Sequence, residues 1–300
     1  MFMSTPRRIN IHIGFHKTAT THFQDTLEMS TDEFRARNII YYPRDQYRKS
    51  LRALTHNPKF NKLPLSIFKQ LYISSRLFSP ITKSKTLLIS EENILGDCVE
   101  LLSTIPYSMN RLEFIRIMSR KVDTTVYFSI RDFSTLLPGA YATSLKYSPR
   151  KALTAKASLI DDISCKRYPS WIDVYERIKN FLPNVKIKIW NQEAYRHNPE
   201  IVFREFTNIT DFKPHKIPDP LSTITPSLKA IKIVEENVRK GNYIKSDNWF
   251  LEVEKIFEEH QAKDLETKFR LFDSETTQIF KKKYQQELSY FEAQNCLVSI

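Results

Sequence analysis

The chain has 300 residues, of which 41% are hydrophobic, so it holds enough apolar material for one large core or two small ones. Only 4 glycines stand against 20 phenylalanines and 14 tyrosines, which argues against a turn-rich β-sandwich or barrel, because tight hairpins use glycine for positive φ angles. The formal net charge of +12 indicates a surface or cleft that attracts anions of any class, and it therefore names no partner.

The three cysteines, Cys98, Cys165 and Cys296, have no spacing that builds a zinc site or a disulfide framework. We expect free thiols and no metal. The first residues carry two arginines but no apolar run long enough for a signal peptide, and no window reaches the roughly 18 apolar residues of a membrane helix. The sequence thus predicts a cytoplasmic protein without a transmembrane segment.

Short apolar or β-branched runs alternate along the chain with longer stretches of helical spacing. The runs cover Ile9–Ile13, Ile39–Tyr42, Thr86–Ile89, Thr125–Ile130 and Val185–Trp190. This alternation is typical of βαβ units, so we expect an α/β fold with three layers, α/β/α, around a central parallel sheet.

The last third of the sequence predicts helices. Between Lys213 and Pro226 the chain holds four prolines and cannot form a regular element. Helical patterns follow at Ser227–Arg239, Trp249–His260 and Ser274–Ala293. We expect one domain over 1–300, made of an α/β core (1–212) and a Pro-rich connection with a helical C-terminal part (213–300).

The sharpest pattern is INIHIGFHKTATTHFQ, residues 9–24, which runs from a strand through a short loop into a helix that begins near Thr20. Backbone amides of such a loop and of the helix N-terminus point at one spot, and the helix dipole adds positive potential there. The Lys17 side chain and the nearby threonine hydroxyls supply further donors. The sequence therefore predicts a phosphate-binding loop.

This loop is not a Walker A motif, because that motif has a glycine directly before its lysine, whereas His16 precedes Lys17. It resembles the 5′-phosphosulfate-binding loop of the sulfotransferases that use 3′-phosphoadenosine-5′-phosphosulfate (PAPS), whose bacterial members commonly read GxxKTGTT before a helix with Gln. Ala19 replaces the usual glycine, and the residues that match are Gly14, Lys17, Thr18, Thr20, Thr21 and Gln24.

The resemblance extends over residues 9 to about 210 and implies a P-loop-NTPase-like sulfotransferase fold with PAPS as the cofactor. It implies a catalytic role for Lys17. The cofactor-binding loop that it implies consists of Gly14, Phe15, His16, Lys17, Thr18, Ala19, Thr20 and Thr21.

Arg131 follows the strongest strand, at the sheet edge where parallel sheets place ligand-binding groups. In the family that the chain resembles, an arginine here and a serine eight positions later hold the 3′-phosphate of PAPS, and a planar guanidinium suits that task. Gly139 stands where the serine is expected. A Gly139 amide, Ser134 or a water is a candidate substitute, and a surface salt bridge is the alternative role for Arg131.

Glu91 and Glu92 end the third predicted strand, where successive side chains point to opposite faces, so only one of them enters a cleft. Resemblance to bacterial members that read SxEN favours Glu92 as the base that takes the proton of the acceptor hydroxyl. A role as helix N-terminal charge is the alternative. His16 and His22 flank the loop as competing bases, whereas His12 is expected to face the core.

The segment RKG at Arg239, Lys240 and Gly241 resembles one that lies over the 3′-phosphate in cytosolic sulfotransferases. A helix that ends in basic residues before glycine is also an ordinary C-cap. Both readings stay open from the sequence.

The resemblance implies that the chain transfers a sulfuryl group from PAPS to an acceptor hydroxyl. The expected acceptor is a glycan or glycolipid, and Tyr141, Tyr147 and Trp171 are candidates for stacking on sugar rings. A P-loop-type nucleotide-dependent kinase is one alternative, and a non-catalytic protein that binds anionic polymers through the +12 charge is another. We expect no nucleic-acid partner.

Overall fold

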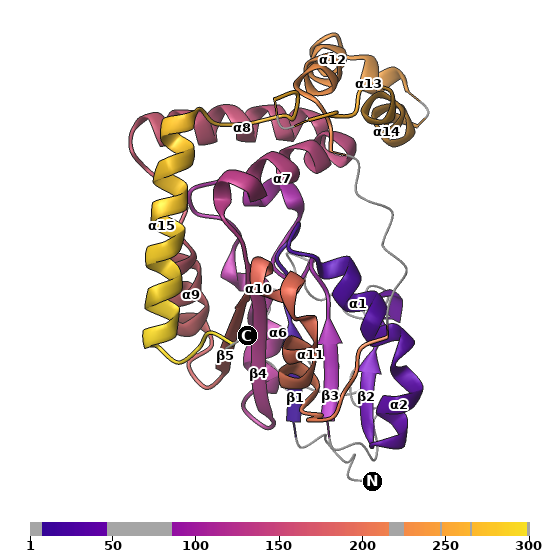
Figure 1. Cartoon of the computed structure of the whole chain (residues 1–300), viewed down its shortest axis with the longest axis vertical. Helices are drawn as coiled ribbons and strands as arrows, with labels where there is room; N and C mark the ends of the chain where they lie inside the picture. The colour runs from indigo at the N-terminus through magenta and orange to yellow at the C-terminus, as the bar shows by residue number, and fades with distance from the viewer. Residues whose placement is uncertain (1–7, 47–85, 216–224, 247, 265, 299–300) are drawn as a thin grey trace.

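The computed structural model describes residues 8–46, 86–215, 225–246, 248–264 and 266–298 (Figure 1). Within these ranges the chain forms a five-stranded sheet in the order β2-β3-β1-β4-β5, and every pairing is parallel. The strands are β1 (Arg8–His12), β2 (Ile39–Tyr42), β3 (Thr86–Ser90), β4 (Asp123–Ile130) and β5 (Lys186–Asn191). The expected α/β fold with a central parallel sheet is confirmed.

Helices flank this sheet, and their bounds follow the apolar periodicity of the sequence. The N-terminal ones are α1 (Thr20–Met29), α2 (Thr31–Ala36), α6 (Glu113–Met118), α7 (Phe133–Tyr147), α8 (Pro149–Ser164), α9 (Trp171–Phe181), α10 (Gln192–His197) and α11 (Pro199–Thr207). Short 3-10 helices lie at η2 (Cys98–Leu101) and η3 (Met109–Leu112). The later ones are α12 (Leu228–Arg239), α13 (Asn242–Lys245), α14 (Trp249–Glu259) and α15 (Ser274–Ala293).

Each face of the sheet carries its own buried cluster, which makes the architecture three-layered. Ile9 and Ile11 of β1 pack into a large cluster with α6, α7 and α9. The opposite face packs against α1, α2, α10 and α11, through aromatic residues such as Phe23 and Phe206. Strand alternation places successive side chains in different clusters, so the central strands are buried on both faces, whereas the edge strand β5 is only partly buried.

The C-terminal elements join the same large cluster. Helix α15 packs along α7 and α9, while α12 and α14 contact α7 and each other (Figure 1). After α15, the Ile189 amide donates to the Cys296 carbonyl oxygen (2.8 Å) and the Val298 amide to the Ile189 carbonyl oxygen (2.7 Å), so residues 296–298 line the outer edge of β5. The division of the domain near residue 213 stays a prediction, and residues 216–224 of the Pro-rich connection lie outside the described residues.

Two expectations about special segments can be compared with the described residues. All three cysteines are free thiols, of which Cys98 and Cys296 are buried and Cys165 is exposed. Among the described helices, none combines the length and the apolar character that crossing a bilayer requires.

His12 is a buried histidine in the middle of the sheet, as expected. Its Nδ1 lies 2.9 Å from the Ser90 hydroxyl oxygen, and its ring stacks on Trp190 with centroids 4.9 Å apart. Burial lowers the pKa of His12 to about 3, although the charge of Glu92 acts in the opposite direction. The ring is therefore neutral in the folded protein at physiological pH.

We predict that this neutral histidine makes the fold acid-sensitive. The unfolded chain takes up a proton near pH 6.5 and the folded chain only near pH 3, so stability is lost as the pH falls through 6.5. The free energy of unfolding from urea titrations is expected to drop by about 2 kcal/mol more between pH 7.5 and pH 5 in the wild type than in His12→Gln. Equal pH slopes in the two proteins would contradict this assignment.

Candidate functional site

The loop between β1 and α1 folds back against the end of β3. Gly14 has a φ of +101°, and a Cβ on it would lie 3.1 Å from the Glu92 carbonyl oxygen. The Gly14 carbonyl accepts a hydrogen bond from the Ser129 amide of β4 (3.1 Å). Glycine is required here because the backbone conformation and the close approach both exclude a side chain.

Two threonine hydroxyls close the loop on itself. Thr18 Oγ1 (2.5 Å) and Thr20 Oγ1 (2.9 Å) both donate to the Phe15 carbonyl oxygen, and Thr18 also contacts the Ser129 hydroxyl. Both threonines are buried, whereas Thr21 is exposed. In this structure the hydroxyl hydrogens of Thr18 and Thr20 hold the loop in shape, and the backbone amides and Lys17 carry its capacity to bind anions.

The N-terminus of α1 has no side chain that caps it. Its N-cap residue is Ala19, which adopts the left-handed conformation with φ 65° and ψ 25°. The amides of the first turn therefore lack a side-chain acceptor, and together with the helix dipole they form a site that suits an anion. The left-handed conformation also explains why glycine is usual at this position of the sulfotransferase pattern.

Lys17 lies at the centre of this loop with a φ of 64°. Among the described residues, its ammonium group forms no hydrogen bond and no ion pair, although the side chain is partly buried. Burial lowers the pKa of Lys17, and the positive charges of Lys146 and Arg131 lower it further, while Glu92 acts in the opposite direction. A buried cation without a partner is costly, and a bound anion would compensate it.

Arg131 reaches the same loop from the end of β4. Its Nη1 donates to the Lys17 carbonyl oxygen (3.0 Å), and its Nε donates to the Thr135 hydroxyl (2.9 Å). The Trp171 indole nitrogen donates to the Arg131 carbonyl oxygen (2.9 Å) and fixes the backbone. The structure thus brings the two predicted cationic residues into one site.

Gly139 of α7 also faces this site. A Cβ on Gly139 would lie 3.7 Å from Lys17 Cγ, in ordinary contact. Ser134, the other candidate on α7, has a buried hydroxyl with no hydrogen-bond partner among the described residues. Gly139 and Ser134, which were considered in place of the expected serine, therefore both lie on α7, which begins two residues after Arg131.

The two adjacent glutamates at the end of β3 have different surroundings. Glu91 is fully buried, and its carboxylate accepts from the Asn93 amide (3.0 Å) and side chain (2.6 Å). Glu92 is partly exposed, and its Oε2 lies 3.6 Å from His16 Nδ1. β3 ends at Ser90, so both glutamates lie in the turn after the strand and not, as the sequence predicts, within it. One carboxylate is nevertheless enclosed, and the other faces the loop that holds Lys17.

His16 is fixed between Glu92 and a backbone carbonyl. Its Nε2 lies 3.0 Å from the Gly96 carbonyl oxygen, which can only accept, so this nitrogen carries the hydrogen. Burial lowers the pKa of His16, but the contact with Glu92 and its negative charge outweigh burial, and the net shift is upward. His16 therefore has the surroundings of a cationic partner for Glu92.

The basic residues of the RKG segment form ion pairs within their own helix, α12. Arg239 pairs with Glu235 (3.0 Å) and Lys240 with Glu236 (2.6 Å), each one helical turn earlier in α12. Gly241 follows with a φ of 77°. Among the described contacts, none joins Arg239 or Lys240 to Lys17 or Arg131, and the geometry is that of a helix C-terminus.

The proposed aromatic platform for sugars is wrong for two of its three members. Tyr141 and Trp171 are completely buried and pack in the core, so neither can stack on a ligand. Tyr147 is 69% exposed and packs against Phe250 with ring centroids 5.3 Å apart. Helical spacing does not distinguish an aromatic core face from an aromatic binding face.

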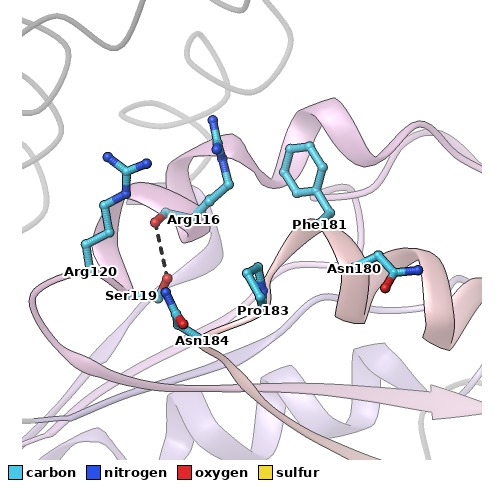
Figure 2. Close-up of a pocket in the computed structure, with 7 residues that line it drawn as sticks. All are labelled: Arg116, Ser119, Arg120, Asn180, Phe181, Pro183 and Asn184. Atoms are coloured by element: carbon cyan, nitrogen blue, oxygen red, sulfur yellow. Dashed lines mark hydrogen bonds between the residues drawn. The ribbon is translucent and has the colours of Figure 1, made fainter.

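A surface pocket of about 190 Å³ lies at the opposite end of the sheet, where the chain enters β4 and β5 (Figure 2). No residue predicted for nucleotide binding lines it. Figure 2 shows Ser119 bonded to the Arg116 carbonyl oxygen within it, and its lining residues are Arg116, Ser119, Arg120, Asn180, Phe181, Pro183 and Asn184. The pocket is therefore separate from the site around Lys17.

Two basic residues near the site were missed from the sequence. Lys146, at the end of α7, lowers the pKa of Lys17 through its positive charge. Its ammonium also pairs with Glu254 (3.0 Å). The positive charge of Arg196, on α10, lowers the pKa of Arg131. The position of Arg196 shortly after a strand is a signal that could have found it, whereas only the tertiary packing of α7 reveals Lys146.

The comparisons with known proteins found similar solved structures. A sulfotransferase from Alicyclobacillus acidocaldarius is 13% identical, with 85% of this chain and 95% of that chain covered and a TM-score of 0.39. Retinol dehydratase in complex with androsterone and the inactive cofactor PAP is 14% identical, and the same enzyme with retinol and PAP is 13% identical. Both cover 95% of this chain and 82% of theirs, at a TM-score of 0.31.

No protein-family model and no curated protein matches the chain.

We predict that Ala19→Gly stabilises the protein, because glycine removes the steric cost of the left-handed conformation at the start of α1. The free energy of unfolding is expected to rise by up to about 1 kcal/mol, since glycine also gains entropy in the unfolded chain. Ala157→Gly, on an exposed position of α8, is the matched control and should lose about 1 kcal/mol. A similar loss in both variants would show that Ala19 is not strained.

Proposed function

We propose that this chain transfers a sulfuryl group from PAPS to the hydroxyl of an acceptor. The observation that carries the proposal is the Lys17 ammonium, partly buried and without a partner among the described residues, on a loop that leads into an uncapped helix N-terminus. The resemblance of this loop to the sulfotransferase pattern and the position of Arg131 beside it support the same function.

The residues present suit a nucleotide with two anionic ends. The loop amides, the first turn of α1 and Lys17 would hold the 5′-phosphosulfate, and Arg131 would bind the 3′-phosphate. PAPS, when bound, supplies the sulfuryl group and departs as the 3′,5′-bisphosphate. Lys17 would neutralise the charge that develops on the departing phosphate oxygen, which is the form of electrostatic stabilisation that needs no reorganisation of the site.

Glu92 is the group best placed to take the proton of the acceptor hydroxyl. It is the partly exposed carboxylate at the loop, whereas Glu91 is enclosed and bonded by Asn93. His16 is a weaker candidate, because its Nε2 is bonded to the Gly96 carbonyl oxygen and its Nδ1 faces Glu92. In this scheme His16 positions the Glu92 carboxylate.

We further propose a glycan or glycolipid as the acceptor and the cytoplasm as the place of reaction. The exposed Tyr147 packs against the half-buried Phe250, and the Lys146 ammonium is 5.5 Å from the Phe250 ring centre. Incubation of the protein with radiolabelled PAPS and a panel of desulfated glycans tests the acceptor class. Label on none of them, with label on small phenols or alcohols, would exclude glycans.

A thermal-shift experiment with two nucleotides distinguishes the proposal from the kinase alternative. We expect the 3′,5′-bisphosphate to stabilise the protein more than ATP with magnesium does, since only the former carries a 3′-phosphate. A larger shift with ATP and magnesium, together with phosphate transfer, would favour a kinase. A binding protein for anionic polymers would show no turnover and a steep dependence of affinity on salt.

We predict that Lys17→Ala lowers turnover by about 10²-fold or more, because the departing phosphate loses its main counter-charge. The fold should persist, since the ammonium has no partner among the described residues. Lys229→Ala, an exposed lysine of α12, removes the same charge elsewhere and should retain activity. Sulfate transfer measured with radiolabelled PAPS checks this, and an unchanged rate in Lys17→Ala excludes the assigned role.

The lowered pKa of Lys17 gives the same residue a pH signature. Its ammonium should lose its proton below the pH at which an ordinary lysine does, so affinity for the bisphosphate is expected to fall as the pH rises through that lowered pKa. Lys17→Arg should keep its charge and show no such decline over pH 7–10.5. Parallel pH profiles of the two proteins in calorimetry would argue against Lys17 as the titrating ligand.

We predict that Glu92→Gln lowers the turnover number by about 10²- to 10⁴-fold while affinity for the bisphosphate stays within a factor of about two. The amide retains the shape of the side chain but accepts no proton. Glu28→Gln, on an exposed position of α1, is the control. Loss of nucleotide binding in Glu92→Gln, rather than loss of turnover, would assign Glu92 to the binding of cofactor instead.

A further inference from the structure

Helix α10 leaves the sheet directly beside Arg131. Asn191, the last residue of β5, is in register with Ile130, the last residue of β4. Arg131 follows Ile130, and α10 begins at Gln192, so both segments start at neighbouring points of the carboxyl edge. This is the same edge at which the loop with Lys17 leaves β1 (Figure 1).

Contacts on both sides hold α10 in place. The hydroxyl of Tyr195 lies 2.7 Å from Nδ1 of His22, which ties α10 to the first turns of α1. The Tyr284 hydroxyl of α15 donates to Glu193 Oε2 (2.8 Å). The Tyr195 ring is buried against Phe203 and Trp190. Arg196 is therefore carried by a short helix of fixed position, next to the phosphate loop.

Arg196 is exposed and, within the described ranges, has no hydrogen bond and no ion pair. Burial lowers the pKa of Arg131, and the charge of Arg196 is the next largest contribution. Glu193 and Asp132 offset this repulsion, but Glu193 is bonded by Tyr284, and Asp132 caps α7 through the Ser134 amide (2.8 Å). Nη2 of Arg131 has no partner among the described residues either.

We propose that Arg131 and Arg196 form a two-arginine clamp for the 3′-phosphate of the nucleotide. This inference rests on the proposed function and adds a ligand that neither the loop pattern nor the RKG segment supplies. It also accounts for the replacement of the expected serine by Gly139, because a second guanidinium, supplied by α10 instead of α7, takes the place of the missing hydroxyl. Two guanidinium groups at neighbouring points of the sheet edge, neither of them in an ion pair among the described residues, suit a doubly charged phosphate.

The test is calorimetric titration with two nucleotides that differ only in the 3′-phosphate, the 3′,5′-bisphosphate of adenosine and 5′-AMP. In Arg196→Ala we expect affinity for the bisphosphate to fall about tenfold or more, which corresponds to loss of a charge-assisted hydrogen bond, and affinity for 5′-AMP to change less than about twofold. Arg120→Ala, an exposed arginine at the opposite end of the sheet, removes the same charge and should affect neither (Figure 2).

Arg196→Lys should recover part of the loss, whereas Arg131→Ala should weaken both nucleotides because Arg131 also holds the Lys17 loop. Should Arg196→Ala be unstable by circular dichroism, Arg196→Gln serves in its place. An unchanged or equally reduced affinity for both nucleotides in the Arg196 variants would overturn the clamp. A wild-type protein that binds neither nucleotide would instead overturn the proposed function, and the two failures are distinct.

Discussion

The hydrogen bond from the Arg131 guanidinium to the Lys17 carbonyl oxygen joins the two halves of the site. It links residues 114 positions apart, and it forms because β1 and β4 are neighbours in the sheet and end at the same edge. Lys17 has a left-handed backbone, which an L-residue adopts only when its surroundings require it. Arg131 supplies part of that requirement, so the same side chain shapes the loop and stands beside the anion site.

Much of the fold could be predicted from the sequence because the sheet is buried on both faces. Such strands appear as short apolar runs, and Ile39–Tyr42 coincides with β2 while the other four agree to within about two residues at each end. The helix Ser274–Ala293 coincides with α15, since Asp273 caps it and accepts from the Thr276 amide. The tight loop between β1 and α1 could be predicted because its backbone geometry requires glycine at position 14.

The rest of the site depends on contacts that no local pattern encodes. Nothing in the spacing of Thr18 and Thr20 reveals that both hydroxyls bond the Phe15 carbonyl, because this follows from the shape of the loop. Tyr141 and Trp171 have the spacing of a helix face, but which face is buried is decided by α15, α12 and the segment around Phe269, far away in the chain. Arg196 is close to Arg131 only through the pairing of β4 with β5.

The pairing of residues 296–298 with β5 has a consequence for how the protein is made. The outer edge of β5 is covered by a segment that follows it in the chain only after α10 to α15, so the sheet stays open on that side until this later segment has been synthesised. The strand whose edge is covered last, β5, is also the strand that leads into α10. A nascent chain therefore has the loop between β1 and α1 long before it has the segment that covers the edge of β5.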